Sequence, residues 1–201
     1  MDKGLLVVVS GPSGAGKGTV MGRLITGGGY ALSVSATTRS PREGEKDGIN
    51  YFFKTRDEFE KMIADNEFLE YAEFCGNYYG TPAPYVQAML DEGKNVILEI
   101  EVKGAFQVKE RCPEAVLVFL APPSIKELES RLVGRGTETA DVIEKRLARA
   151  LEELDLIDNY DYVVVNDDID EAVSDIRSIV RAERRKTARN TDIKNTLKGV
   201  E

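Results

Sequence analysis

The stretch that decides the fold is Leu5-Leu6-Val7-Val8-Val9-Ser10-Gly11-Pro12-Ser13-Gly14-Ala15-Gly16-Lys17-Gly18-Thr19. Its first five residues are all apolar, with no polar residue between them, which is typical of a strand buried on both faces of a parallel sheet. From Lys17 onward, apolar residues recur at helical spacing at Val20, Met21 and Leu24. The sequence therefore predicts a strand, a glycine-rich turn and a helix in direct succession.

The turn between this strand and helix has the composition of a phosphate-binding P-loop. Its glycines bring backbone N–H groups close to phosphate oxygens, and the helix N-terminus adds partial positive charge aimed at the same anion. Lys17 is placed to reach the β- and γ-phosphates of a nucleoside triphosphate. Gly18 stands where the common motif has Ser or Thr, so a direct metal ligand is not expected there, although the Thr19 hydroxyl follows. The motif alone does not identify the phosphate acceptor, because GTPases, motors, helicases and kinases all use it.

Strand and helix patterns alternate along much of the remaining chain, which favours a parallel sheet with helices on both faces. We expect strands at residues 95–100, 115–120 and 162–165, and helices at 85–92, 105–111, 125–133, after Thr139, and at 169–182. The region from residue 30 to about 82 differs, because short β-branched and aromatic segments at 30–38, 50–55 and 68–74 surround one helical pattern at 57–66. This region is predicted to be an inserted mixed α/β lobe.

Composition excludes several classes of function. The chain has 201 residues, a length that suits one domain with inserted segments. It contains no histidine. Ser-His-Asp, Cys-His and histidine-metal mechanisms are therefore excluded. The two cysteines, Cys75 and Cys112, are too few and too far apart for a disulfide framework or a zinc site.

The charge distribution and hydropathy bear on partners and location. Residues 1–180 carry 20 basic and 32 acidic residues, whereas residues 181–201 carry seven basic and three acidic ones. An acidic body of this kind argues against general nucleic-acid binding, and no apolar run approaches the length of a membrane span. We therefore expect a cytoplasmic protein with no nucleic-acid or membrane partner; the sequence does not indicate its oligomeric state.

Six blocks of sequence together resemble the guanylate kinase family, within the nucleoside monophosphate kinases. They lie at residues 11–19, 35–42, 48–53, 76–81, 134–137 and 166–168. The resemblance covers about residues 4–183. It implies a P-loop NTPase fold with a three-layer α/β/α core (4–33, 84–124 and 159–183), an inserted mixed α/β GMP-binding lobe (34–83) and a helical lid (125–158). The basic tail at 184–201 lacks an apolar stripe, and we expect it to fray.

A pair of arginines in the second block is suited to binding a phosphate group. Arg39 and Arg42 flank Ser40-Pro41, and two guanidinium forks can clamp one phosphate dianion. Read alone, the segment is also compatible with a solvated surface turn. By resemblance, these arginines bind the phosphate of GMP, together with the hydroxyls of Tyr51 and Tyr79.

Recognition of guanine requires acceptors for its N1–H and N2–H₂ groups, which one carboxylate can supply. The resemblance assigns this role to Glu70 and adds the hydroxyls of Ser35 and Thr81. It also assigns the acidic pair Glu99 and Glu101 to the GMP site. Two roles stay open for this pair, namely contact with guanine and contact with the water around Mg²⁺.

Four arginines lie in or beside the segment Gly134–Ala140, which joins the helices expected at 125–133 and after Thr139. Arg131 and Arg135 are four residues apart, and Arg146 and Arg149 are three apart, so both pairs can point into one space. The resemblance implies a mobile lid that closes over ATP, with Arg135 against adenine and phosphate and Arg146 at the transferring group. For Arg131 and Arg149, the sequence is equally compatible with an exposed position on the helix pair and no role in binding ATP.

The resemblance thus implies ATP-dependent phosphorylation of GMP or dGMP, in purine nucleotide metabolism, with release of ADP. The catalytic residues would be Lys17, Arg39, Arg135 and Arg146. ATP would also contact residues 11–19, Asn166 and Asp168, and Mg²⁺ would be held through phosphates and water with no direct protein ligand, near Thr19. Two alternatives are a non-catalytic guanylate-kinase-like protein-binding module and a ribose 1,5-bisphosphate kinase.

Overall fold

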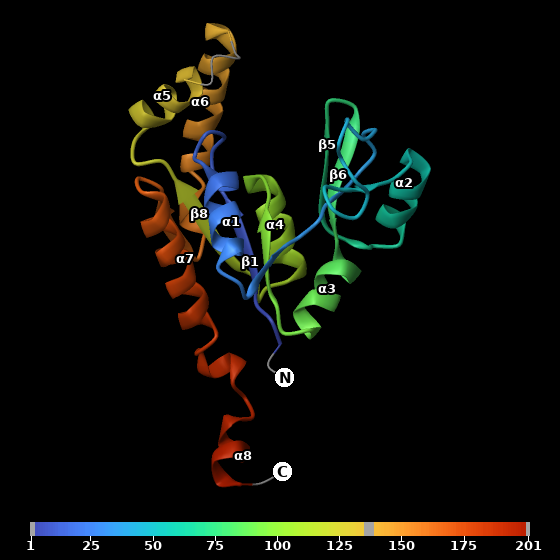
Figure 1. Cartoon of the computed structure of the whole chain (residues 1–201), viewed down its shortest axis with the longest axis vertical. Helices are drawn as coiled ribbons and strands as arrows, with labels where there is room; N and C mark the ends of the chain where they lie inside the picture. Colours follow the sequence, from blue (N-terminus) through green and yellow to red (C-terminus); the bar gives the residue numbers. More distant parts are fainter. Residues whose placement is uncertain (1–2, 135–138, 200–201) are drawn as a thin grey trace.

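The computed structural model describes residues 3–134 and 139–199. Five strands form a fully parallel sheet, with β1 at its centre (Figure 1). Their order is β2 (Tyr30–Leu32), β7 (Asn95–Glu99), β1 (Leu6–Ser10), β8 (Val116–Ala121) and β9 (Tyr162–Val165). All residues of β1 and β8 are buried, which explains their uninterrupted apolar sequence.

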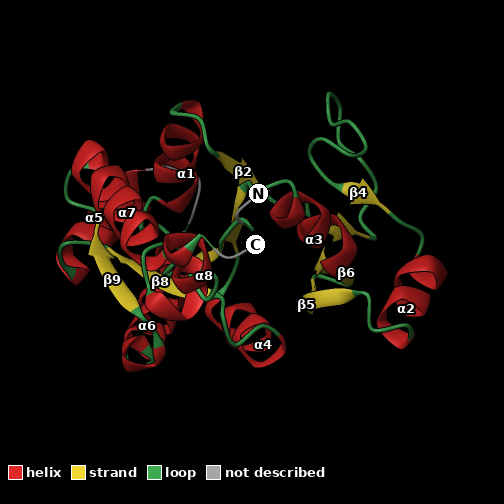
Figure 2. Ribbon diagram, turned by 90° about the horizontal axis from the view of Figure 1, so that it is seen from below, coloured by secondary structure: helices red, strands yellow, loops and turns green. Residues whose placement is uncertain are grey.

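Helices cover both faces of this sheet, so the predicted three-layer α/β/α core is confirmed (Figure 2). One face packs against α1 (Lys17–Thr26) and α7 (Ile169–Glu183). The other face packs against α3 (Ala83–Asp91) and α4 (Val102–Arg111). The helices and the sheet contact each other mainly through aliphatic side chains, which recur at helical spacing in the helices and alternate between the two faces in the strands. Burial of these side chains is therefore the main stabilising contribution to the core.

A second, four-stranded sheet lies beside the core and carries its own helix, α2 (Arg56–Ala64) (Figure 1). Its strand order is β4 (Phe52–Phe53), β3 (Ala36–Thr37), β6 (Asn77–Pro82) and β5 (Phe68–Phe74). β3 and β4 pair in parallel, whereas β6 is antiparallel to both of its neighbours. Phe59 and Phe68 stack with their ring centroids 4.3 Å apart and form the centre of a small separate core. We refer to this unit as the lobe.

Two details of the lobe differ from the sequence prediction. The segment predicted as one strand at 30–38 is two strands in different sheets, because β2 pairs with β7 of the core and β3 pairs inside the lobe. Strand β6 was not predicted, since its glycine and proline are typical of turns. Gly80 belongs there because a Cβ atom would lie 2.8 Å from the Glu70 carbonyl oxygen across the sheet.

A pair of helices, α5 (Ile125–Gly134) and α6 (Ala140–Leu154), projects from the carboxyl edge of the core sheet (Figure 1). They pack against each other through Leu128, Leu132 and Ala150, which are all buried. A short 3₁₀ helix, η1 (Ile157–Asn159), then leads into β9. None of the helices within residues 3–134 and 139–199 is both long and apolar enough to cross a membrane.

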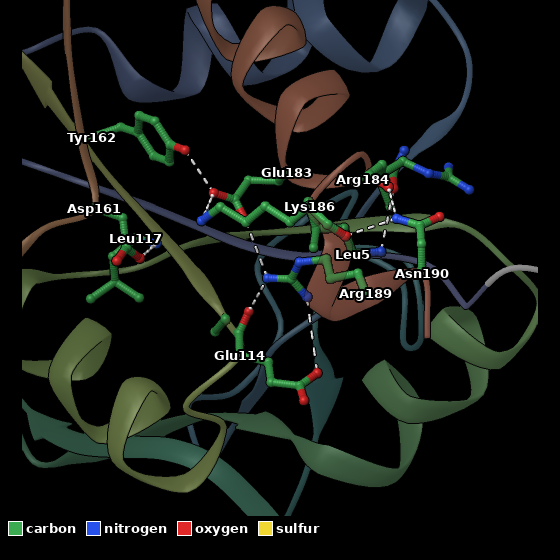
Figure 3. A network of polar contacts seen from close by, with 12 residues as sticks. Leu5, Glu114, Leu117, Asp161, Tyr162, Glu183, Arg184, Lys186, Arg189 and Asn190 are labelled. Carbon is green, nitrogen blue, oxygen red and sulfur yellow. Dashed lines mark hydrogen bonds and ion pairs between the residues drawn. The ribbon is translucent and has the colours of Figure 1, made fainter. Parts of the chain in front are cut away.

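The C-terminal segment does not fray directly after α7, so that expectation was wrong. It forms η2 (Thr187–Arg189) and α8 (Ile193–Lys198). The Arg189 guanidinium donates a hydrogen bond to the Glu114 carbonyl oxygen at 2.7 Å, and Asn190 donates to the Lys186 carbonyl oxygen at 2.8 Å (Figure 3). Polar contacts of η2, which a search for apolar stripes overlooks, therefore hold this part of the segment to the core.

The centre of this network is the carboxylate of Glu183, whose side chain is 1% exposed. It accepts a hydrogen bond from the Tyr162 hydroxyl at 2.6 Å and one from Arg189 at 3.3 Å, and it pairs with Lys186 (Figure 3). Burial opposes ionisation of Glu183, but the contacts from Lys186, Tyr162 and Arg189 outweigh it and lower its pKa. The buried acid thus joins the end of α7 to β9 and to the C-terminal segment.

Candidate functional site

The candidate site lies at the carboxyl edge of the core sheet. The P-loop follows β1, Glu99 ends β7 and Asn166 follows β9. Because these strands are parallel, their carboxyl ends meet at one edge, which is where open α/β sheets bind ligands. The lid helices α5 and α6 and the lobe are attached at the same edge (Figure 1).

The backbone of the P-loop requires glycine. Gly11, Gly14 and Gly16 have φ angles of 146°, 96° and 90°, in a region that other residues rarely adopt. A Cβ atom on Gly11 would also lie only 2.2 Å from the carbonyl oxygen of Leu120 in β8. Gly16 occupies the N-cap position of α1. The loop therefore turns directly into the helix, whose N-terminus is suited to binding a phosphate group.

Lys17 extends across the P-loop. Its Nζ donates hydrogen bonds to the carbonyl oxygens of Gly11 at 2.6 Å and Pro12 at 3.2 Å. Burial lowers the pKa of this ammonium group, and the carboxylates of Glu99, Glu153 and Glu101 oppose that shift. The lysine is thus a partly buried positive charge held at the loop, with three carboxylates close enough to act on it.

The surroundings of the P-loop fit a Mg²⁺ ion that is held chiefly by phosphates and water. A Cβ atom on Gly18 would lie 3.7 and 3.9 Å from the two carboxylate oxygens of Glu99, so this carboxylate lies where the common motif has a hydroxyl. Oxygen ligands suit Mg²⁺, which usually retains several waters. Within the described parts of the chain, no three acidic or cysteine side chains converge on a possible metal position. Thr19 instead lines a groove beside Arg23 and Asp170.

The lobe brings together the residues predicted to bind an acceptor phosphate. The Arg39 guanidinium lies 5.5 Å from the ring centroid of Tyr51, and the rings of Tyr51 and Tyr79 are 6.1 Å apart. A contact with the Tyr79 hydroxyl contributes to the raised pKa of Arg39, although Glu45 is the largest cause. Arg42 is exposed three residues further on. The cluster of cationic and hydroxyl donors is suited to an anion.

Glu70 lies on β5 directly opposite Thr81 on β6. The Thr81 hydroxyl donates a hydrogen bond of 2.7 Å to Glu70 Oε1, and the other carboxylate oxygen lies opposite Gly104 of α4. Burial raises the pKa of Glu70, and the contact with Thr81 opposes this shift. One oxygen of this buried carboxylate is bonded to Thr81 and the other faces α4, so the group is a selective acceptor for N–H donors.

A cavity of about 300 Å³ separates the lobe from the core. Four of the predicted site residues line it: Ser35, Tyr51 and Thr81 on the side of the lobe, and Glu99 on the side of the core. The volume is at the lower end of the range for small-molecule sites. Its lining also includes Leu32, Ser33, Asn50, Leu98 and Ile100. Three of the predicted GMP-binding residues therefore share one cavity with Glu99 of β7. Its lining does not include Arg39, Arg42, Glu70 and Tyr79.

The lid helices contact the P-loop edge through arginines. Arg146 of α6 donates a hydrogen bond to the hydroxyl of Ser13 in the P-loop. Arg149 pairs with Glu101 at 2.8 Å, which places Glu101 beside the lid, and Glu101 does not line the cavity between lobe and core. Arg135, predicted to be both catalytic and ATP-binding, lies outside the described residues. Two of the four lid arginines thus reach the core from α6.

The turn after β9 supports the P-loop from behind. Asn166 is 4% exposed, and its side-chain nitrogen donates a hydrogen bond to the Ala15 carbonyl oxygen at 2.7 Å. Its own carbonyl oxygen accepts a hydrogen bond from Arg131 of α5 at 3.1 Å. Asp168 caps α7, accepting hydrogen bonds from the backbone N–H groups of residues 170 and 171. In this structure both predicted ATP-binding side chains are engaged with the protein.

Three residues of the site were not predicted from the sequence. Asn50 and Ser33 line the cavity, and the Ser33 hydroxyl is buried without a hydrogen-bond partner in the described residues. Glu45 pairs with Arg39, although the sequence Glu43-Gly44-Glu45 suggests only a turn. The acidic residue six positions after Arg39 was the available signal, but spacing alone does not show that a turn brings the two charges together.

Comparison with known proteins identifies the family of this chain. The chain matches the sequence model of the guanylate kinase family over residues 3–183. It is 59% identical to the guanylate kinase of Shouchella clausii over 94% of this chain and 92% of that protein. It is 55% identical to the guanylate kinase of Bacillus subtilis, over 94% of this chain and 93% of that one. The crystal structure of guanylate kinase from Anaplasma phagocytophilum superposes with a TM-score of 0.73 at 38% identity, covering 94% of this chain and 90% of the other. Because the family model covers residues 3–183 and the relatives from Shouchella clausii and Bacillus subtilis are more than half identical to it over most of their length, this chain belongs to the guanylate kinase family.

Proposed function

We propose that this enzyme transfers the γ-phosphoryl group of ATP to the phosphate of GMP or dGMP and releases ADP. The observation that carries the proposal is the cavity between lobe and core, which Ser35, Tyr51 and Thr81 line from the lobe. Glu99 lines it from the core, and its carboxylate would lie 3.7 Å from a Cβ atom on Gly18 of the P-loop. A phosphoryl group can pass between two nucleotides only where their sites open onto one space. The family and its relatives support the same reaction.

On the donor side, we assign the ATP phosphates to residues 11–19. Backbone N–H groups and the N-terminus of α1 would bind the phosphate oxygens. Lys17 would exchange its two carbonyl contacts for the β- and γ-phosphates. Arg146, already at Ser13, would meet the γ-phosphoryl group, and Arg135 would extend over the adenine. Asn166 and Asp168 would border the adenine.

On the acceptor side, we assign the phosphate of GMP to Arg39, Arg42, Tyr51 and Tyr79. The base would lie against Glu70, which can accept hydrogen bonds from both N1–H and N2–H₂ of guanine, with Ser35 and Thr81 beside it. Adenine has a lone pair at N1, so the same carboxylate would face an acceptor. A buried polar group left unpaired costs about 1–3 kcal/mol, which predicts at least tenfold discrimination.

In the transfer step, the bond between the γ-phosphorus and the β–γ bridging oxygen breaks, and a bond to an oxygen of the GMP phosphate forms. Such transfer depends on positioning and on positive charge near the equatorial oxygens, and no strong base is needed. Lys17, Arg39 and the lid arginines would supply that charge. Mg²⁺ bound to the phosphates and to water beside Glu99 would neutralise further negative charge when ATP is present. Closure of α5 and α6 would exclude water as a competing acceptor.

The test is an assay of ADP release with five acceptors offered in turn: GMP, dGMP, AMP, CMP and UMP. We expect kcat/KM for GMP and dGMP to exceed that for the other three by more than tenfold. Fastest turnover with AMP or a pyrimidine nucleotide would contradict the guanine assignment. ATP binding without any phosphoryl transfer would instead indicate a non-catalytic module.

A further inference from the structure

The carboxylate of Glu45 contacts the arginine that the proposed function places at the acceptor phosphate. Arg39 Nη2 lies 2.9 Å from Glu45 Oε1 and 3.0 Å from Oε2. The two side chains are 17% and 19% exposed, so water screens this pair only weakly. The rings of Tyr51 and Phe53 lie beside the guanidinium, at 5.5 and 6.0 Å from its central carbon. The arginine is therefore enclosed by one acid and two aromatic rings.

The same carboxylate is bonded to the backbone that carries the second arginine. Glu45 Oε2 accepts a hydrogen bond of 2.7 Å from the Arg42 N–H, and the Glu45 N–H donates one of 3.1 Å to the Arg42 carbonyl oxygen. These two bonds close a four-residue turn in which Gly44 has a φ angle of 84°. The position of Glu45 is thus set by the turn, and both arginines are tied to that one side chain.

We infer that Glu45 is a positioning residue for the acceptor phosphate, which fixes the guanidinium of Arg39 and links it to the turn that carries Arg42. The inference rests on the proposed function. An unrestrained arginine loses side-chain rotamer freedom when it is immobilised, and preorganisation reduces that loss on binding. Arg39 Nη1 is also fixed, because it donates a hydrogen bond to the Ser40 carbonyl oxygen at 2.7 Å. One glutamate against two arginines still leaves a net positive charge for the phosphate dianion.

In the opposite role, the Glu45 carboxylate would occupy the anion site beside Arg39, and the incoming phosphate would displace it. The turn argues against displacement, because the carboxylate would have to give up the Arg42 N–H as well as Arg39. Charge-assisted hydrogen bonds of this kind are among the stronger ones in proteins. The two roles predict opposite changes in the affinity for GMP, so kinetics can distinguish them.

The first experiment compares Glu45→Gln with the wild type and with Glu43→Gln as a matched control. Glu43 is exposed on the same turn, and the control removes the same charge two residues away. For Glu45→Gln we expect KM for GMP to rise about tenfold, while KM for ATP and kcat change less than about threefold, a loss mainly in acceptor binding. Glu43→Gln should stay within about twofold of the wild type on every parameter. An unchanged or lower KM for GMP in Glu45→Gln would overturn the inference.

A double-mutant cycle tests whether Glu45 acts through Arg39. GMP binding is measured by calorimetry for the wild type, Arg39→Ala, Glu45→Gln and the double variant. We expect the effect of Glu45→Gln to disappear in the Arg39→Ala background, because the residue that it positions is absent. An effect of the same size in both backgrounds would overturn the inference.

The outcomes also separate this inference from the proposed function. A wild-type enzyme that does not phosphorylate GMP would refute the proposed function, whereas normal wild-type activity with an unaffected Glu45→Gln variant would refute the inference alone. If circular dichroism shows that Glu45→Gln is unfolded, Glu45→Asp replaces it. This variant keeps the charge but shortens the reach to Arg39, and it should raise KM for GMP in the same direction.

Discussion

The side-chain nitrogen of Asn166 donates a hydrogen bond to the backbone carbonyl oxygen of Ala15, 2.7 Å away, and so joins the turn after β9 to the P-loop. The carbonyl oxygen of Asn166 accepts from Arg131, which in turn pairs with Glu127 at 3.0 Å on α5. A continuous series of polar contacts therefore runs from the first lid helix through Asn166 to the phosphate-binding loop.

Asn166→Ala is expected to weaken both the fold and the donor site. Removal of the side-chain amide leaves the Ala15 carbonyl oxygen without its partner in a buried position, which costs about 1–3 kcal/mol of unfolding free energy. Because Ala15 belongs to the P-loop, KM for ATP should rise more than KM for GMP. Urea unfolding and steady-state kinetics measure the two effects. Asp167→Ala, an exposed neighbour, is the control for stability and should change it by less than about 0.5 kcal/mol.

Lys17→Ala should abolish most activity and leave the fold intact. The ammonium is partly buried, and its charge lies where phosphate oxygens would gather, so its loss should lower kcat by about 100-fold or more. The thermal unfolding midpoint should remain close to that of the wild type, since burial already penalises the charged lysine. Lys103→Ala, at an exposed position of α4, should retain wild-type kcat. A kcat for Lys17→Ala within a few-fold of the wild type would contradict the assigned role.

Glu70→Gln is expected to reduce discrimination between purines. The amide retains an acceptor for the Thr81 hydroxyl but no longer offers two equivalent oxygens to guanine. We expect kcat/KM for GMP to fall by about 10- to 100-fold, with AMP affected much less. Kinetics with both acceptors measure this ratio. An unchanged preference for GMP would show that the base is read by other residues.

The same substitution should alter the pH dependence of stability. Burial raises the pKa of Glu70 above its usual value of 4.5, so the folded protein retains a proton that the unfolded chain releases. This contribution to stability is present below the unfolded pKa and is lost as pH rises through the folded pKa. The stability of Glu70→Gln relative to the wild type should therefore increase as pH rises from 4.5 into that window. Urea unfolding at a series of pH values measures the difference, and a difference independent of pH would contradict the assignment.

The donor half of the site could be predicted from the sequence because its information is local. Nine consecutive residues form the P-loop, and the buried strand before it has an unmistakable apolar run. The acceptor half depends on strand register. Glu70 meets Thr81 only because β5 and β6 pair at that register, with an irregularity between Phe68 and Glu70, and β6 itself has a turn-like sequence. Composition carries no information on such a pairing.

Polar contacts that form only when the chain folds back on itself could likewise not be predicted from sequence patterns. The resemblance pointed to Arg39, but the turn that brings Glu45 against it is visible only in the structure. The same is true of the C-terminal segment, where no apolar stripe predicts an ordered chain. Its order comes from polar groups gathered around Glu183 (Figure 3). One of them, the Tyr162 hydroxyl, is 21 residues away from Glu183 in the sequence.

Glu183→Gln should destabilise the whole domain. A buried carboxylate that pairs with Lys186 and Arg189 would be replaced by a neutral amide, which removes the main counter-charge of both cations. Because Lys186 is 57% and Arg189 25% exposed, water screens the unpaired cations, and the loss should be smaller than the ~3–5 kcal/mol of a fully buried pair. Urea unfolding measures this loss. Glu114→Gln is the matched control, because Glu114 faces Arg189 from the solvent at 3.9 Å with a side chain that is 91% exposed. It should cost less than about 1 kcal/mol.

The pH dependence of this effect gives an independent check. The contacts from Lys186, Tyr162 and Arg189 outweigh burial and lower the pKa of Glu183 below its usual value of 4.5. The stabilisation is therefore fully present above that value and is lost as pH falls through the folded pKa. The stability difference between the wild type and Glu183→Gln should stay constant from pH 7 to about pH 5 and shrink in more acidic solution. A difference that grows as the pH is lowered would mean that the carboxylate is held in its protonated form, and the network would then have to act through neutral hydrogen bonds alone.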